Sequence, residues 1–421
     1  MKVQKRALVA ALLTAPMLAA IGSFSTAHAS GFAVFTQGAS ALGQGNAVTA
    51  HADDPSAVFY NPALINKLPG TQVFFGSTLI STSREFRSST TGTEYEPDAK
   101  LNYPTTLYVT SKLNDKWSVG LGVFNPFGLK TNWGTEWEGR YLATKSELTT
   151  YNVNPVVSYR ITPALTFAAG VDVVFLDAKL EKRLLVPVAP GVFTDASNKF
   201  EGDGTGVGYN VGVAYDINKD LSVGLSYRSQ VDVDVDGTGQ AQILATGTEI
   251  VNAPGHSKIK LPQQLTGGIA YRVTEPLIVE AGFRWEGWSS FDELAITVDT
   301  PTPTRTVTRR DWSDAWGANV GAKYKLNPNV SLLAGYVYGS TPVPDSTFDP
   351  TIPDADTHIF TVGTDMQIKK FRVALAYGYQ KLLERTKDND MDPALPAGLK
   401  ANGTYNTDAH LFGFSLTYPF R

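Results

Sequence analysis

Trp117-Ser118-Val119-Gly120-Leu121-Gly122-Val123 is the stretch that decides the fold. Large apolar side chains stand at every second position, with serine or glycine between them. Side chains of a β-strand point alternately to opposite faces, so this spacing predicts a strand with one apolar face and one small or polar face. The alternation recurs at 221–228 and 371–380. A soluble sandwich and a membrane barrel both show it, because they differ only in where the apolar face points.

The connections between the strands separate these two folds, because short turns and long polar stretches alternate from residue 71 onward. The short turns lie at 114–116, 161–163, 218–220, 274–276, 327–329 and 369–370. The long stretches lie near 84–99, 126–143, 183–201, 236–256, 289–310, 340–357 and 383–407. Bacterial outer-membrane barrels have an even number of strands, short periplasmic turns and long outer loops. We therefore predict an all-β protein, a 14-stranded antiparallel transmembrane β-barrel over residues 71–421.

The end of the chain fits the same barrel. Its apolar stripe consists of Phe412, Phe414, Leu416, Tyr418 and Phe420. A barrel in lipid leaves no strand edge unpaired, so we expect this last strand to pair with the first.

The first residues indicate an exported protein. Lys2, Lys5 and Arg6 precede an apolar run at 7–20, and Ala27-His28-Ala29 offers a small-residue cleavage site, so residues 1–29 are predicted to be a signal peptide. No later stretch is apolar over the roughly 18 residues that a membrane-spanning helix needs. Removing three of the 36 basic residues leaves 33 against 40 acidic ones, a net charge of −7. That charge excludes a nucleic-acid-binding surface.

Residues 30–70 lack the alternation. They are rich in Gly, Ala and Ser, and contain Asp53-Asp54 and a turn at Asn61-Pro62-Ala63. Small residues allow tight folding in a confined space, and Pro62 fixes a backbone angle. On composition alone, this segment is either a plug folded into the barrel or a disordered periplasmic tail.

The chain resembles the long-chain fatty-acid outer-membrane transporters of the FadL type. The most specific similarity lies in Gly31-Phe32, 41–47, Ala52-Asp53-Asp54 and 61–65, which look like the N-terminal hatch of that family. Further similar stretches lie at 177–182, 288–294, 314–316, 340–344 and 352–356. The resemblance implies fourteen strands and a hatch, here residues 30–70, that folds into the lumen and blocks a continuous water channel.

Aromatic residues gather in the outer loop at 126–143. We expect a capture groove for hydrophobic ligands formed by Phe127, Leu129, Trp133, Trp137 and Tyr141. The last three recur at every fourth position, which would place them on one face of a helix. An aromatic girdle or a self-packed loop explains the same residues equally well.

A fatty acid needs an apolar slot with a cation at one end, because each buried methylene gains about 0.8 kcal/mol but an unpaired buried carboxylate is costly. The candidate carboxylate-pairing residues are Lys182, Arg309 and Arg310. The resemblance implies that Lys182 stands where the family has a base that helps to hold the carboxylate, and that Arg309 and Arg310 lie close to another family base. Contact with lipopolysaccharide phosphates, or plain solvation, is the alternative for such loop residues.

Asn125-Pro126-Phe127-Gly128 ends the third strand. Proline cannot donate to a strand ladder and glycine weakens one, so pairing should fail there. The resemblance implies a kinked strand beside a lateral gap in the barrel wall, through which a ligand leaves sideways into the membrane. The alternative is that the strand simply ends at this point.

These features predict a monomeric outer-membrane protein of a Gram-negative cell, embedded among lipids and lipopolysaccharide. It would carry long-chain fatty acids, or similar hydrophobic molecules, down their gradient. A relative that passes aromatic hydrocarbons such as toluene would need no carboxylate partner, so Lys182 and Arg309 divide the two ligand classes. A purely structural or adhesin barrel is a third possibility, although it has no need of a hatch.

No enzyme, cofactor or metal site is expected. The histidines after the signal peptide, His51, His256, His358 and His410, show no triad setting. The acidic run that starts at Asp232 begins like a calcium loop, but Ile243 stands where the bidentate glutamate belongs. The chain has no cysteine, which excludes disulfides and thiolate metal sites.

Overall fold

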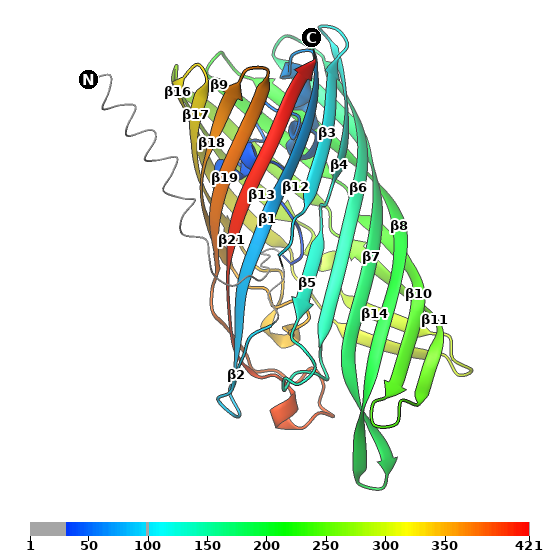
Figure 1. Cartoon of the computed structure of the whole chain (residues 1–421). Coiled ribbons are helices and arrows are strands. Elements are labelled where there is room, and N and C mark those ends of the chain that lie inside the picture. The colour runs from blue at the N-terminus through cyan, green and yellow to red at the C-terminus, as the bar shows by residue number, and fades with distance from the viewer. Residues whose placement is uncertain (1–30, 98–100, 421) are drawn as a thin grey trace.

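The computed structural model describes residues 31–97 and 101–420, so the predicted signal peptide lies outside the described residues. Fourteen strands close an antiparallel barrel (Figure 1), which confirms the predicted fold. In order around the barrel they are β1 (Thr71–Ser88), β3 (Thr105–Lys112), β4 (Trp117–Phe124), β6 (Lys145–Arg160), β7 (Leu165–Ala189), β8 (Val192–Asp216), β9 (Leu221–Arg228), β12 (Gln264–Thr274), β13 (Leu277–Glu286), β16 (Ala315–Asn327), β17 (Val330–Gly339), β18 (Thr357–Ile368), β19 (Phe371–Leu382) and β21 (Gly403–Phe420). β1 pairs with β21 from Thr71↔Phe420 to Ser88↔Gly403, and this pairing closes the barrel.

The apolar faces of the strands point outward. Phe360 and Val362 on β18 are each 56% exposed, whereas Thr361 between them is 4% exposed. The alternation alone was compatible with a soluble sandwich and with a membrane barrel. The outward direction of the apolar side chains is that of a barrel wall in lipid, with small and polar residues toward the lumen.

Further strands extend the barrel at the end opposite the short turns. They are β2 (Glu94–Tyr95), β5 (Gly128–Asn132), β10 (Val231–Ile243), β11 (Glu249–Leu261), β14 (Glu293–Val298), β15 (Thr304–Arg309) and β20 (Arg385–Lys387). The prediction of polar loops at 183–201 and 236–256 is therefore wrong in part: β7 and β8 continue as one long hairpin, visible in Figure 1, and β10 pairs with β11. These segments stay in strands because they keep an apolar face, as with the buried Ala196, Phe200 and Ala241.

The N-terminal segment folds inside the barrel (Figure 1). It contains α2 (Ala39–Gly43), α3 (Ala57–Tyr60) and the 3-10 helix η2 (Pro62–Lys67), while η3 (Trp288–Ser290), η4 (Asp345–Thr347) and η5 (Ala397–Leu399) belong to the outer loops. Its small residues allow close approach to the wall: Gly45 has a φ of +59°, and a Cβ there would lie 2.9 Å from the backbone nitrogen of Tyr336. None of the helices in residues 31–97 and 101–420 is long and apolar enough to cross a membrane.

Candidate functional site

The hatch is held to the barrel wall by a carboxylate on β13. Glu280 is 1% exposed and accepts hydrogen bonds from three successive backbone amides, at 2.6 Å from Thr49, 2.9 Å from Ala50 and 3.0 Å from His51. Successive N–H groups that point to one side form a natural anion site. A single barrel side chain therefore fixes the direction of the hatch backbone.

A second anchor is a network of four charged residues. Asp53 in the hatch lies 2.5 Å from Lys323 and 2.6 Å from Arg372, and Asp365 on β18 lies 2.6 Å from each of the same two cations. Desolvation would raise the pKa of Asp53, but Arg372 and then Lys323 hold it well below its usual range. The network therefore ties the hatch to β16, β18 and β19.

The other predicted hatch residues shape the segment itself. The carboxylate of Asp54 accepts from the backbone nitrogen of Ser56 at 2.9 Å and from its hydroxyl at 2.5 Å, and burial raises the pKa of Asp54. Asn61 caps η2 by accepting from the backbone nitrogen of Ala63, and Pro62 occupies the first helical turn, where no donor is needed. These residues therefore fold the hatch and do not face a ligand cavity.

The third barrel strand is interrupted between β4 and β5. Phe124 lies opposite Asn152 on β6, and Gly128 lies opposite Thr149, so residues 125–127 face only the two residues 150 and 151. This one-residue excess is a bulge. The hydroxyl of Thr150 partly replaces the ladder, since it accepts from the backbone nitrogen of Phe127 at 3.0 Å and donates to its oxygen at 2.7 Å.

The N-terminal end of the hatch completes the interrupted strand from inside. The nitrogen of Val34 donates to the oxygen of Pro126, and the nitrogen of Gly128 donates to the oxygen of Phe32, both at 2.8 Å. The side chain of Gln37 donates to the oxygen of Asn125 at 2.7 Å. Within the part of the chain that the structure describes, β5 pairs with β6 and with no second strand. Residues 32–37 therefore lie against the weakest point of the wall.

Phe32 anchors this segment in an aromatic cluster. Its ring is 1% exposed, with ring centroids at 4.6 Å to Trp288, 5.9 Å to Phe291, 6.0 Å to Phe127 and 6.1 Å to Trp312. Such contacts contribute about 0.5–1.5 kcal/mol each beyond area burial. Sequence reasoning placed Phe127 in this region but did not connect it with Phe32.

A buried carboxylate in the outer loop holds the start of the same segment. Asp354 is 1% exposed; its Oδ2 accepts from the nitrogen of Gly31 at 3.0 Å and from the hydroxyl of Thr341 at 2.7 Å. Burial raises the pKa of Asp354 to about 7, against these hydrogen bonds. Its Oδ1 has no hydrogen-bond partner within the described residues. The pKa of Asp354 therefore lies close to neutral pH.

The residues predicted for the capture groove are all buried, between 2% exposed for Trp137 and 8% for Leu129. Trp133 and Trp137 stack at 4.5 Å, and the indole nitrogen of Trp133 donates to the oxygen of Pro350 at 2.9 Å. The rings thus fill the cap of the barrel.

The expected helical face at residues 133–141 is wrong, because this stretch consists of turns. Gly134 has a φ of +76°, outside the helical range, and Trp137 folds back over Gly139, so close that a Cβ there would lie 2.2 Å from its ring. Tyr141 turns away from the two tryptophans, and its hydroxyl donates to Asp195 at 2.5 Å. Spacing alone could not reveal these glycine-driven turns.

Two of the three predicted carboxylate-pairing residues approach one buried carboxylate. Arg310 is 2% exposed and pairs with Asp349 at 2.7 Å. A spanning strand needs about 9–11 residues, so Lys182, which follows the periplasmic end of β7 at Leu165 by 17 residues, lies beyond the membrane. Burial lowers the pKa of Lys182, against the charges of Asp392 and Asp349, and no ion pair of this lysine occurs among the described residues.

Arg309 is different, because its side chain is exposed and pairs with Asp311 at 2.7 Å. The structure thus brings Lys182 and Arg310 toward the interior of the cap and leaves Arg309 at the surface. Ligand binding by any of the three stays a prediction.

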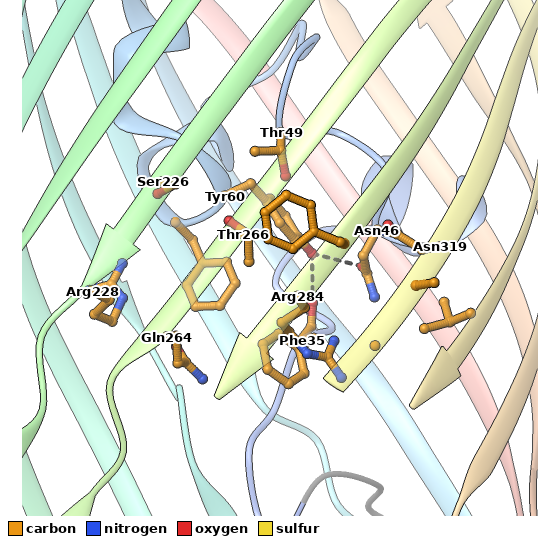
Figure 2. A pocket seen from close by; sticks show the side chains of 15 residues that line it. Phe35, Asn46, Thr49, Tyr60, Ser226, Arg228, Gln264, Thr266, Arg284 and Asn319 are labelled. Carbon is orange, nitrogen blue, oxygen red and sulfur yellow. Dashed lines mark hydrogen bonds between the residues drawn. The ribbon is translucent and has the colours of Figure 1, made fainter. Parts of the chain in front are cut away.

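Sequence reasoning missed a cavity of about 590 Å³ between the hatch and the barrel wall formed by β9, β12, β13, β16 and β17 (Figure 2). Its lining includes two guanidinium groups: Arg228 pairs with the fully buried Asp172, and Arg284 pairs with Glu286 at 3.3 Å. A second cavity of about 490 Å³ shares part of this wall. The signal was present in β13, where Glu280, Arg284 and Glu286 stand on the non-apolar face. Charges at that parity of a membrane strand must face the lumen.

These features define a class of protein: a closed outer-membrane barrel with a lumenal hatch and an interrupted strand in its wall. The model of one family, outer membrane protein transport protein (OMPP1/FadL/TodX), matches residues 20–420. The chain therefore belongs to this family, which places it in the outer membrane of Gram-negative bacteria.

Curated relatives and solved structures agree with this assignment. The long-chain fatty acid transport protein of Escherichia coli O6:H1 (strain CFT073) is 26% identical over 442 residues, covering 95% of this chain and 97% of that protein. Outer membrane protein P1 of Haemophilus influenzae (strain Rd) is 25% identical over 465 residues, covering 97% and 98%. A Pseudomonas aeruginosa FadL homologue superposes with a TM-score of 0.84 at 18% identity, over 93% and 100% of the chains. The toluene transporter TodX of Pseudomonas putida gives 0.75 at 21%, over 91% and 98%; both likenesses concern the fold.

Proposed function

We propose that this protein carries long-chain fatty acids passively across the outer membrane and releases them sideways through the wall at residues 125–128. The observation that carries the proposal is the pairing of residues 32–34 with residues 126–128, where hatch backbone replaces a strand neighbour. Below this point Glu280 and the Asp53 network hold the hatch across the lumen. The hatch blocks the lumen on the periplasmic side, whereas the interrupted strand in the wall is covered only by residues 32–34 of the hatch. This arrangement favours exit of the ligand sideways through the wall over exit through a water-filled channel.

The cap supports an acidic ligand. Lys182 lies half-buried without an ion pair in the described residues; the charges of Asp392 and Asp349 act on it, and Asp349 pairs with Arg310. A ligand carboxylate would compensate Lys182, whereas a buried cation otherwise carries a desolvation cost. Lys182 is therefore the proposed carboxylate partner, with Arg310 as its neighbour.

Capture is assigned to the packed aromatic cap. Phe127, Leu129, Trp133 and Trp137 belong to one apolar cluster, which an acyl chain would enter by parting the rings. Each methylene that leaves water gains about 0.8 kcal/mol, so a long acyl chain can outweigh several aromatic contacts of about 1 kcal/mol. The protein is proposed to act as a monomer among outer-membrane lipids and lipopolysaccharide, with no catalytic step and no cofactor.

Uptake of aromatic hydrocarbons is the second candidate function. The lumenal cavity is lined by aromatic rings, and its cations are already paired with carboxylates, so it suits a neutral ligand. Two of the similar solved structures are toluene transporters. Such a ligand would not depend on Lys182. A structural or adhesin barrel predicts no flux of either ligand.

The test is uptake of radiolabelled oleate and toluene by cells that have this protein as their sole route. We expect Lys182→Met to lower oleate uptake about tenfold and to leave toluene uptake unchanged. Lys179→Met is the matched control, because Lys179 lies on the same strand and pairs with Glu181 on its outer side at 3.2 Å. If wild-type uptake of both ligands equals that of barrel-free cells, the transporter proposal fails. If only toluene exceeds that background, the fatty-acid version fails.

A further inference from the structure

The cavity in Figure 2 differs in chemistry from the cap. Its apolar lining includes Phe35, Phe59 and Val337. Its two guanidinium groups already have buried carboxylate partners, Asp172 for Arg228 and Glu286 for Arg284. A buried charge that is already compensated gains little from a further anion. The cavity therefore suits a neutral ligand better than a carboxylate.

Arg284 and Phe35 form a contact inside this cavity. The Cζ atom of Arg284 lies 3.6 Å from the centroid of the Phe35 ring, whereas Arg228 lies at 5.5 Å from Phe59 and 5.3 Å from Phe124. Phe35 is only half-buried, and Figure 2 shows its ring beside the guanidinium group. A cation–π contact of this kind changes an equilibrium by roughly twofold to thirtyfold.

The same two residues separate the two cavities. Phe35, Asn46, Arg284 and Val337 line both the cavity of about 590 Å³ and the cavity of about 490 Å³. Displacement of the Phe35 ring would therefore open space on both sides of it.

We propose that Arg284 is a specificity-determining residue that recognises an aromatic ring of the ligand, which takes the place of the Phe35 ring on the guanidinium face. An aromatic ligand regains the cation–π contact that Phe35 gives up, and a saturated ligand of the same size does not. The inference rests on the proposed function in one respect, that hydrophobic molecules enter the lumen. It adds the ligand class that this cavity selects.

Ring exchange also acts on the hatch. The carbonyl oxygen of Phe35 accepts a hydrogen bond from the hydroxyl of Tyr60 at 2.7 Å, and the neighbouring Val34 pairs with Pro126. When the ring of Phe35 leaves Arg284, this residue keeps its main-chain hydrogen bond to Tyr60, while the ring of Phe32 stays in its aromatic cluster. Ligand in the cavity therefore removes one side-chain contact of the segment that lies at the interrupted strand.

The test compares toluene with methylcyclohexane, which have the same carbon skeleton but differ in the π system. Partition of each into phospholipid vesicles with and without the protein is measured by headspace gas chromatography. We expect wild type to bind toluene about fivefold better than methylcyclohexane, after correction for protein-free vesicles. Arg284→Met should abolish the preference and Arg284→Lys should keep part of it. Arg272→Met, which removes a guanidinium on β12 outside the lining of both cavities, should keep it whole.

A paired variant guards against misfolding, because Arg284→Met leaves Glu286 buried beside no cation. Arg284→Met/Glu286→Gln removes both charges and should also lack the preference. Phe35→Leu tests the contact from its other side and should bind toluene more tightly than wild type, because the competing ring is gone. Equal binding of both ligands by wild type, or a preference that survives in Arg284→Met and in Arg284→Met/Glu286→Gln, overturns the inference alone. Binding of neither ligand overturns the inference together with the proposed hydrophobic lumen.

Discussion

Ala33 and Phe127 face each other as an antiparallel β-bridge between the hatch and the barrel wall. The hydrogen bonds that flank this pair run from Val34 to Pro126 and from Gly128 to Phe32, so Ala33 and Phe127 themselves are a non-hydrogen-bonded pair. Such pairs have Cα atoms about 4.5 Å apart, which is within the range that a disulfide spans.

The double variant Ala33→Cys/Phe127→Cys should therefore lock the hatch onto the interrupted strand. The chain has no native cysteine, so no other disulfide can form. We expect oxidised cells to take up oleate at the rate of barrel-free cells, and reduction with dithiothreitol to restore uptake. Each single variant, treated with the same oxidant, controls for the loss of the Phe127 ring. Full uptake by the oxidised double variant would show that the ligand leaves elsewhere.

Asp354 should make the stability of the barrel depend on pH. Burial raises its pKa to about 7, against about 3.9 in an unfolded chain, so the folded state binds the proton more tightly. Stability then falls as pH rises from about 4 to about 7 and is level above that, with a total change of about 4 kcal/mol at most.

Asp354→Asn should remove this pH dependence. Asparagine keeps an acceptor for Gly31 and Thr341 but carries no charge, so the variant should be more stable than wild type at pH 8 and similar at pH 4. Urea unfolding of the barrel in vesicles, followed by tryptophan fluorescence, measures the difference. Asp311→Asn is the control, because Asp311 is exposed and its φ of +47° suits asparagine equally well. If the free energy of unfolding depends on pH equally in wild type and in Asp354→Asn, Asp354 is not the cause of the pH dependence.

The strand count was predictable, whereas the contacts that make the site were not. The side chains of turn residues such as Asn114 and Asn218 accept hydrogen bonds from backbone nitrogens three residues later. Each short turn is therefore determined by a few neighbouring residues and can be predicted from them. The contact of Gly31 with Asp354 joins residues 323 positions apart and exists only because the barrel closes. Aromatic content identified the cap, but which rings stack is decided by turns at Gly134 and Gly139.

The charged residues that face the lumen could have been predicted from the sequence. Arg284 stands at the lumenal parity of β13, opposite to Phe283, which is 45% exposed on the outside. The predicted carboxylate-pairing residues, Lys182, Arg309 and Arg310, lie at the outer end of the barrel and do not include Arg284. Parity along a membrane strand is the better guide, since lipid excludes unpaired charge from the other face.

Glu280 provides the sharpest test of the closed floor. Glu280→Ala leaves the amides of Thr49, Ala50 and His51 without their acceptor, and each unsatisfied buried donor costs about 1–3 kcal/mol. We expect these three amides to lose protection from hydrogen exchange by at least tenfold, and water entry at the loosened hatch should raise ion conductance in planar bilayers. Glu275→Ala, in the exposed turn between β12 and β13, is the matched control and should change neither measurement. If protection at residues 49–51 survives in Glu280→Ala, Glu280 does not hold the hatch, and the floor of the lumen is closed by other contacts with the wall, among them the Asp53 network and the hydrogen bonds of Gly45 with Thr361 and Asn319.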